Sequence, residues 1–187
     1  MNIFVLDSNP VKSAQMLCDA HVIKMALESA QLLSTHYRMT ILNADGVGIQ
    51  KLADMLYKST HINHPCRVCL DNPFNRAWLV YHFRALLSEY TYRYGKVHGS
   101  SKLRHIFSIP MALDEWLPHA LDKLTFPKCM PDTYKTGGDD IDSIVQSYRN
   151  YYKYKQETMR RFRYTNREIP EWLIKADLME VFDDTKY

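Results

Sequence analysis

The chain has 187 residues, which is the length of one domain with terminal additions rather than of two domains. Hydrophobic residues make up 46% and charged residues 24% of it, so a core can form and bulk disorder is excluded. No apolar run approaches the roughly 18 residues of a membrane span, and no basic segment precedes the first apolar residues, so we expect neither a membrane segment nor a secretory signal. Four cysteines are too few for a disulfide scaffold, which predicts a reducing, cytoplasmic location.

Helical periodicity dominates along the chain. Only 6 Gly and 8 Pro occur, and few segments alternate apolar and polar residues as half-buried strands do. The expected helices cover residues 10–38 with a break near 18–19, 50–57, 73–96 and 141–162. The sequence therefore predicts an all-α fold, a single-domain bundle of four to six helices over residues 1–187, to which a short N-terminal strand at residues 2–6 is an optional addition.

The first long helix carries a polar stripe. His21, Lys24, Glu28 and Gln31 fall at steps of three and four residues, so they share one helix face. In a cleft wall, Glu28 would handle protons and His21 would donate to a substrate oxygen, while Lys24 would hold an anion or act as an amine nucleophile. Asp19 and Gln31 would contact the substrate beside them. The alternative is an ordinary solvated helix face.

Residues 61–69 form a polar loop with two histidines and two cysteines. Asn63 and His64 precede a proline and a helix start, where backbone N–H groups favour anions, so both are candidate substrate-binding residues. Four ligands from so short a peptide rarely surround one zinc ion, so we expect no metal site. Cys66 and Cys69 are then expected to pack as small apolar groups.

The end of the 73–96 helix is also basic. Arg93, Lys96 and His98 are candidates for binding a phosphate of the substrate. The structural alternative is a helix end capped by Gly95, with basic side chains that interact with the helix dipole.

Charge is segregated near the C-terminus, although the whole chain carries only +3. Residues 148–167 hold seven Lys or Arg against one Glu, and residues 168–187 hold six acidic residues against two Lys. The basic aromatic helix, expected at residues 141–164, can neutralise phosphates and stack on unpaired bases of a nucleic acid. The acidic tail at 168–187 can compete with that nucleic acid for the basic residues. The expected DNA-binding residues are Arg149, Lys153, Lys155, Arg160, Arg161 and Arg163. The alternative places the aromatic rings in the core with the cations extending outward.

The first long helix also resembles part of a known enzyme family. The run of Leu17, Asp19 and His21, followed seven residues later by Glu28, resembles the first active-site helix of the T4-type pyrimidine-dimer DNA glycosylases, the endonuclease V family. The resemblance implies an all-helical fold, a flipped base, a catalytic carboxylate at Glu28 and a substrate contact at His21. That family uses an N-terminal α-amine exposed by removal of methionine before a small residue, whereas Asn2 is bulky, so we expect Met1 to stay.

The chain is also similar to phage proteins that share the opening Asn-Ile-Phe and the Cys-Asp-x-His-Val segment. Such families include enzymes that hypermodify thymine in DNA. The sequence therefore predicts a DNA-binding enzyme that acts on a flipped pyrimidine nucleotide, with no cofactor. The alternatives are a phage transferase acting on 5-substituted uracil in DNA, a non-catalytic nucleic-acid-binding protein, and an enzyme of small nucleotides.

Overall fold

The structure is a computed structural model that describes residues 2–41 and 47–174, and its described part is all-α. Its α-helices are α1 (Pro10–Gln15), α2 (Asp19–Ile41), α3 (Val47–Met55), α4 (Pro65–Val68), α5 (Pro73–Tyr94), α6 (Leu113–Trp116) and α7 (Ile141–Thr158). The described part thus has seven α-helices rather than four to six, because two single-turn helices, α4 and α6, were not expected. Short 3₁₀ turns join several of them, and none of the described helices has the length and apolarity needed to cross a membrane.

The N-terminal segment, residues 2–7, is extended but does not form the optional strand. Its four apolar residues, 3–6, are buried, so its backbone polar groups need partners inside the protein. Side chains supply them, since Ser13 Oγ accepts from Leu6 N–H and donates to Phe4 O, and Arg149 Nε donates to Leu6 O. These bonds replace the pairing that a neighbouring strand would give.

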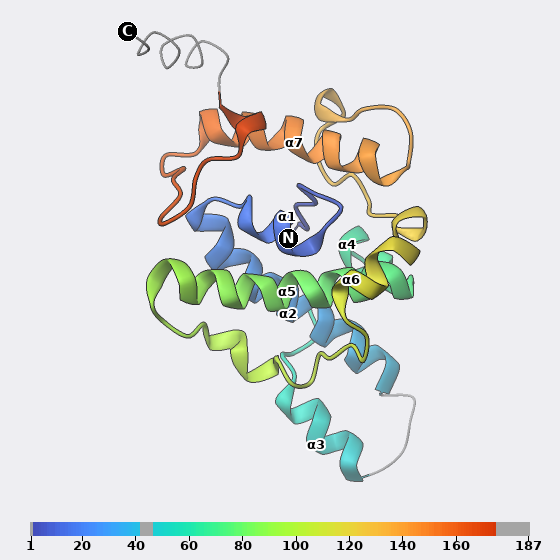
Figure 1. Ribbon diagram of the computed structural model, residues 1–187. Helices are drawn as coiled ribbons and strands as arrows, with labels where there is room; N and C mark the ends of the chain where they lie inside the picture. The colour runs from blue at the N-terminus through green and yellow to red at the C-terminus, as the bar shows by residue number, and fades with distance from the viewer. Residues whose placement is uncertain (1, 42–46, 175–187) are drawn as a thin grey trace, which may run out of the picture.

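The two long helices α2 and α5 pack against each other and form the centre of the molecule (Figure 1). α1 also packs on α5, and Trp78 of α5 donates from its indole N–H to Ser8 O just before α1. α7 contacts the N-terminal segment instead, through Phe4 and the buried ring of Tyr152. The N-terminal segment therefore lies between α7 and the rest of the bundle.

Local sequence explains most helix boundaries. The expected break near residues 18–19 is confirmed, because α1 ends at Gln15 and α2 begins at Asp19. Asn72 caps α5 by accepting from Phe74 N–H, and α5 ends at Gly95, whose φ of 63° favours glycine. α7 is likewise capped by Asp140.

The expected helix at 141–162, and with it the basic aromatic helix at 141–164, is too long at its C-terminal end. α7 ends at Thr158, and Met159 is extended, with φ −82° and ψ 125°. Residues 159–174 then run back across the molecule, which we call the C-terminal strap, and Arg163 O accepts from Asp19 N–H at the start of α2. This tertiary contact competes with continued helix. Of the acidic tail, residues 168–174 belong to the strap and residues 175–187 lie outside the described part.

A buried ionic network fastens the strap. Asp19 accepts from Arg93 Nη1 at 3.0 Å and from both the N–H and the Oγ1 of Thr165, at 2.9 and 2.7 Å. Arg93 also donates to Glu89, which binds Arg167 of the strap through two hydrogen bonds of 2.8 and 2.9 Å. Burial acts to raise the pKa of Asp19, but the bonds from Thr165 and Arg93 outweigh it and hold the pKa below its usual value.

Candidate active site and nucleic-acid surface

A polar cleft of about 270 Å³ lies where the N-terminal segment, α2 and α7 meet. The three predicted catalytic residues, His21, Lys24 and Glu28, all line it, and so does Lys155 of the predicted DNA-binding set. The other lining residues are Asn2, Phe4, Met25, Cys129 and Tyr151. The structure therefore brings the polar stripe of α2 and the basic region of α7 to one place.

Glu28 is the carboxylate of this cleft. Its side chain is only 14% exposed, and Oε1 lies 3.4 Å from Nζ of Lys24, one helical turn earlier. Its other oxygen, Oε2, is buried and has no hydrogen-bond partner in the described part of the chain. Buried polar atoms are nearly always satisfied in folded proteins, so an unpaired carboxylate oxygen at a cleft indicates a place for a ligand's donor or positive charge.

His21 is buried and held in a fixed orientation. Tyr152 Oη lies 2.8 Å from His21 Nδ1 and accepts from Cys18 N–H at 2.8 Å. When the hydroxyl of Tyr152 donates to Nδ1, the ring proton of His21 is on Nε2. Burial, helped by the charges of Lys24 and Lys155, lowers the pKa of His21 to about 4. At neutral pH the ring is therefore an uncharged N–H donor.

One side of the cleft is aromatic. The ring of Phe4 stacks on His21 with centroids 4.6 Å apart, and the ring of Tyr151 also stacks on Phe4, with centroids 6.3 Å apart. Lys155 Nζ lies 5.0 Å from the centroid of Tyr151, so a cation and a π-face share the rim. This combination suits a nucleotide, which offers a base to stack on and a phosphate to neutralise.

The candidate substrate-binding residues are distributed more widely. Asp19 and Arg93 belong to the buried network under the strap, so their polar groups are directed to each other rather than to the cleft. His64 caps α4 by accepting from Cys66 N–H. Burial lowers the pKa of His64, and the negative charge of Glu28 opposes this shift, so the two side chains lie within electrostatic reach.

None of the candidate substrate-binding residues is among those that line the cleft. Gln31 is half-buried, whereas Asn63 and Lys96 are exposed. His98 caps the 3₁₀ turn at Gly99–Leu103 by accepting from Ser100 N–H. Its ring packs against Tyr90 at 4.9 Å, and Gly95 caps α5, as the structural alternative proposed for this end of the helix.

The predicted DNA-binding residues divide into two groups. Lys153, Arg160, Arg161 and Arg163 are exposed, and the three arginines lie on the strap rather than on a helix. Arg149 is engaged internally, since it bonds Leu6 O and lies 3.5 Å from a carboxylate oxygen of Asp7. The aromatic residues divide in the same way, because Tyr148 and Tyr152 are fully buried while Tyr154 is 39% exposed.

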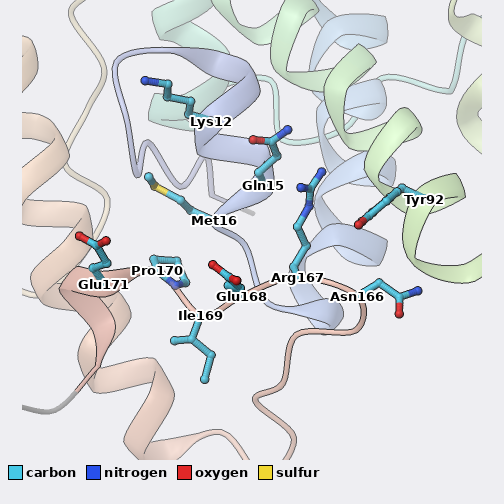
Figure 2. A pocket seen from close by; sticks show the side chains of 10 residues that line it. All are labelled: Lys12, Gln15, Met16, Tyr92, Asn166, Arg167, Glu168, Ile169, Pro170 and Glu171. Atoms are coloured by element: carbon cyan, nitrogen blue, oxygen red, sulfur yellow. The ribbon is translucent and has the colours of Figure 1, made fainter. Parts of the chain in front are cut away.

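Larger hollows exist elsewhere among the described residues. One of about 480 Å³ lies between α1, α5 and the strap, where Figure 2 shows Arg167 extending toward Gln15 and Tyr92. That guanidinium binds Glu89 and lies 4.4 Å from the centroid of Tyr92. The smaller cleft is the better candidate site because it contains a buried carboxylate oxygen that no protein group in the described residues satisfies.

Several residues that line the cleft were not predicted from the sequence. Asn2, Phe4, Cys129 and Tyr151 come from three distant segments, and no local spacing indicates that they meet Glu28. Within the described residues, no group of three or more His, Cys, Asp or Glu is arranged to hold a metal ion.

A family model described as pyrimidine dimer DNA glycosylase matches residues 1–102, which is more than half of the chain. The chain belongs to the pyrimidine dimer DNA glycosylase family. No curated protein and no solved structure matches it significantly. The family match covers α1 to α5, so it includes the polar stripe of α2 but not α7, the strap or Cys129. Family membership makes this a glycosylase-like enzyme with DNA as its partner.

Proposed function

We propose that this protein is a DNA glycosylase that takes one extruded pyrimidine nucleotide of a damaged site into the cleft between the N-terminal segment, α2 and α7. The observation that carries the proposal is Glu28, a largely buried carboxylate with one oxygen free of protein partners in the described residues, in a segment that matches the glycosylase family. The cleft, at about 270 Å³, is just below the roughly 300–1,000 Å³ of common ligand pockets. That size suits one nucleotide better than a dinucleotide.

Three polar residues of the cleft, Glu28, His21 and Lys24, have roles in breaking the bond between the sugar C1′ and the base nitrogen. Positive charge develops on the sugar as this bond breaks, and the Glu28 carboxylate stabilises it. The oxygen of a solvent water bonds to C1′ in place of the base, and the water's proton balances the departing pyrimidine. Negative charge develops on the departing pyrimidine, and the Nε2–H of His21 donates a hydrogen bond to the base oxygen. Lys24 pairs with Oε1 of Glu28, so we assign it to positioning and phosphate contact rather than to nucleophilic attack.

DNA is held outside the cleft by the exposed cations. Lys153 lies on α7 and Arg160, Arg161 and Arg163 follow on the strap, and we assign the contacts with the DNA backbone to these four exposed cations. Phosphate contacts of this kind fix the position of a duplex without reading its sequence. They leave recognition to the groups that meet the extruded base.

The test uses short duplexes with a single cis–syn thymine dimer, with undamaged thymine, or with 5-hydroxymethyluracil. We expect an abasic site at the dimer, shown by strand breakage in alkali and by release of thymine after photoreversal, and no change in undamaged DNA. A mass change of 5-hydroxymethyluracil in the presence of small amines, with the dimer left intact, would instead favour transfer at the 5-position. Binding without any change of any duplex would favour a non-catalytic protein.

A further inference from the structure

Two cysteines from distant parts of the chain meet in the wall of the cleft. Sγ of Cys66, in α4, lies 3.6 Å from Sγ of Cys129, in the loop before α7. Both are free thiols, and Cys129 is a lining residue of the cleft while Cys66 is fully buried behind it. The proposed glycosylase chemistry uses neither of them.

The environment gives the two thiols different chemistry. A hydrogen bond from the Cys66 thiol, with the charge of Lys135, holds the pKa of Cys129 below its usual value despite partial burial. That same hydrogen bond, together with burial, raises the pKa of Cys66. Cys129 is therefore the more acidic thiol of the pair and Cys66 the less acidic one, which is the arrangement of an attacking and a resolving thiol.

The third thiol of this region is less suited to the reaction. Burial raises the pKa of Cys69 to about 12, and its Sγ bonds Cys66 O at 3.3 Å. Cys18 is fully buried under Tyr152, and burial raises its pKa too. Among the four cysteines, all of which lie in the described residues, only the pair of Cys66 and Cys129 combines contact between the sulfurs with access from the cleft.

We propose that Cys66 and Cys129 form a redox modification site, at which a peroxide converts the two thiols into an intramolecular disulfide. The Cys129 thiolate attacks one peroxide oxygen and the O–O bond breaks, giving a sulfenic acid and, after protonation, water. The Cys66 sulfur then attacks the Cys129 sulfur, the S–O bond breaks, and the Cys66 proton leaves with the hydroxide as a second water. Two thiols are oxidised and one peroxide is reduced.

Oxidation changes the shape of the cleft. A disulfide brings the two sulfurs from 3.6 Å to about 2.05 Å, so the side chain of Cys129, which lines the cleft, shifts by up to about 1.5 Å. Asn2 also lines the cleft, and its Oδ1 loses the hydrogen bond that it accepts from the Cys66 thiol at 3.9 Å. If the cleft is the glycosylase site, as proposed above, a shift of this size lowers turnover about tenfold to 100-fold, and a dithiol reductant restores it.

Tryptic peptides test the chemistry without any activity assay. Cys66, Cys69 and Cys129 fall in separate peptides, residues 59–67, 68–76 and 129–135. The native full-length chain is treated with hydrogen peroxide, its remaining thiols are alkylated, and the unreduced peptides are analysed by mass spectrometry. We expect a cross-link between peptides 59–67 and 129–135, formed within one chain and removed by dithiothreitol.

Three variants identify the roles of the thiols. Cys69→Ser should form the same cross-link as the parent, and Cys129→Ser should form none. Cys66→Ala should accumulate a sulfenic acid on Cys129 that dimedone traps, and its melting temperature is measured to show that it folds. A cross-link to peptide 68–76, a link between two chains, or no disulfide in the folded parent would overturn the proposal. Cross-linking without DNA cleavage by the reduced parent would contradict only the glycosylase assignment.

Discussion

The network beneath the strap gives a prediction that can be worked through from the structure. Asp19→Asn keeps the size of the side chain but removes its charge, and one of the two oxygens that accept from Arg93 and Thr165 becomes a donor. Asp19 is 8% exposed and the side chain of Arg93 is fully buried, so water replaces these bonds poorly. Hydrogen bonds to charged groups contribute about 1.5–3 kcal/mol each, and breaking a buried ion pair costs about 3–5 kcal/mol.

We expect the free energy of unfolding to fall by about 3 kcal/mol, because Arg93 keeps its bond to Glu89 and so loses only part of its stabilisation. For a chain of this length that is a decrease of roughly 6–12 °C in melting temperature. Calorimetry of Asp19→Asn and of a control, Asp132→Asn, measures it. The control removes a carboxylate that pairs with Lys135 at the surface and should melt like the parent. Equal melting temperatures for both variants, with weaker DNA binding only in Asp19→Asn, would refute the structural role and favour the substrate contact expected from the sequence.

Two further changes test other parts of the structure. His82 is buried against Trp78 with neither ring nitrogen bonded in the described part of the chain, and burial lowers its pKa to about 3. As pH falls, His82 takes up a proton in the unfolded chain before it does in the folded protein, so the free energy of unfolding decreases below about pH 6.5, by about 2 kcal/mol at pH 5. Urea titrations at pH 7 and pH 5 should show that His82→Leu lacks this loss of stability. An unchanged pH dependence in the variant would contradict the assignment. Replacing Arg160, Arg161 and Arg163 by Ala should reduce the slope of log affinity against log salt by up to about 3, and an unchanged slope in DNA titrations would remove the strap from the DNA surface.

Much of the helix pattern follows from local sequence. Periodic apolar residues locate α2, α5 and α7, and a capping Asn or Asp marks the start of α5 and of α7. The break before Asp19 is visible as a polar interruption of an apolar pattern. The end of α7 is different, because the strap leaves the helix axis to bond Asp19, a partner about 145 positions earlier. No local preference contains that information.

The candidate site, like the helix pattern, follows from local sequence only in part. The polar stripe of α2 identifies His21, Lys24 and Glu28 from spacing alone, since residues three and four apart share a helix face. Spacing does not say that His21 is buried beneath Phe4, or that Cys129 faces the same cleft. It also gives Asp19 and Arg93 the appearance of site residues, because a charge that will be paired inside the protein looks the same in the sequence as one that will meet a ligand.

The most direct test of the proposed active site is the single-turnover rate of Glu28→Gln on a duplex with one thymine dimer. The variant keeps the size of the side chain but loses the negative charge that the sugar requires, so the rate should fall about 100-fold to 10,000-fold while affinity for the duplex is unchanged or higher. Glu115→Gln, which alters an exposed carboxylate on α6, is the matched control and should react like the parent. A Glu28→Gln protein that melts and cleaves like the parent would show that the cleft between the N-terminal segment, α2 and α7 is not the site of glycosidic bond cleavage.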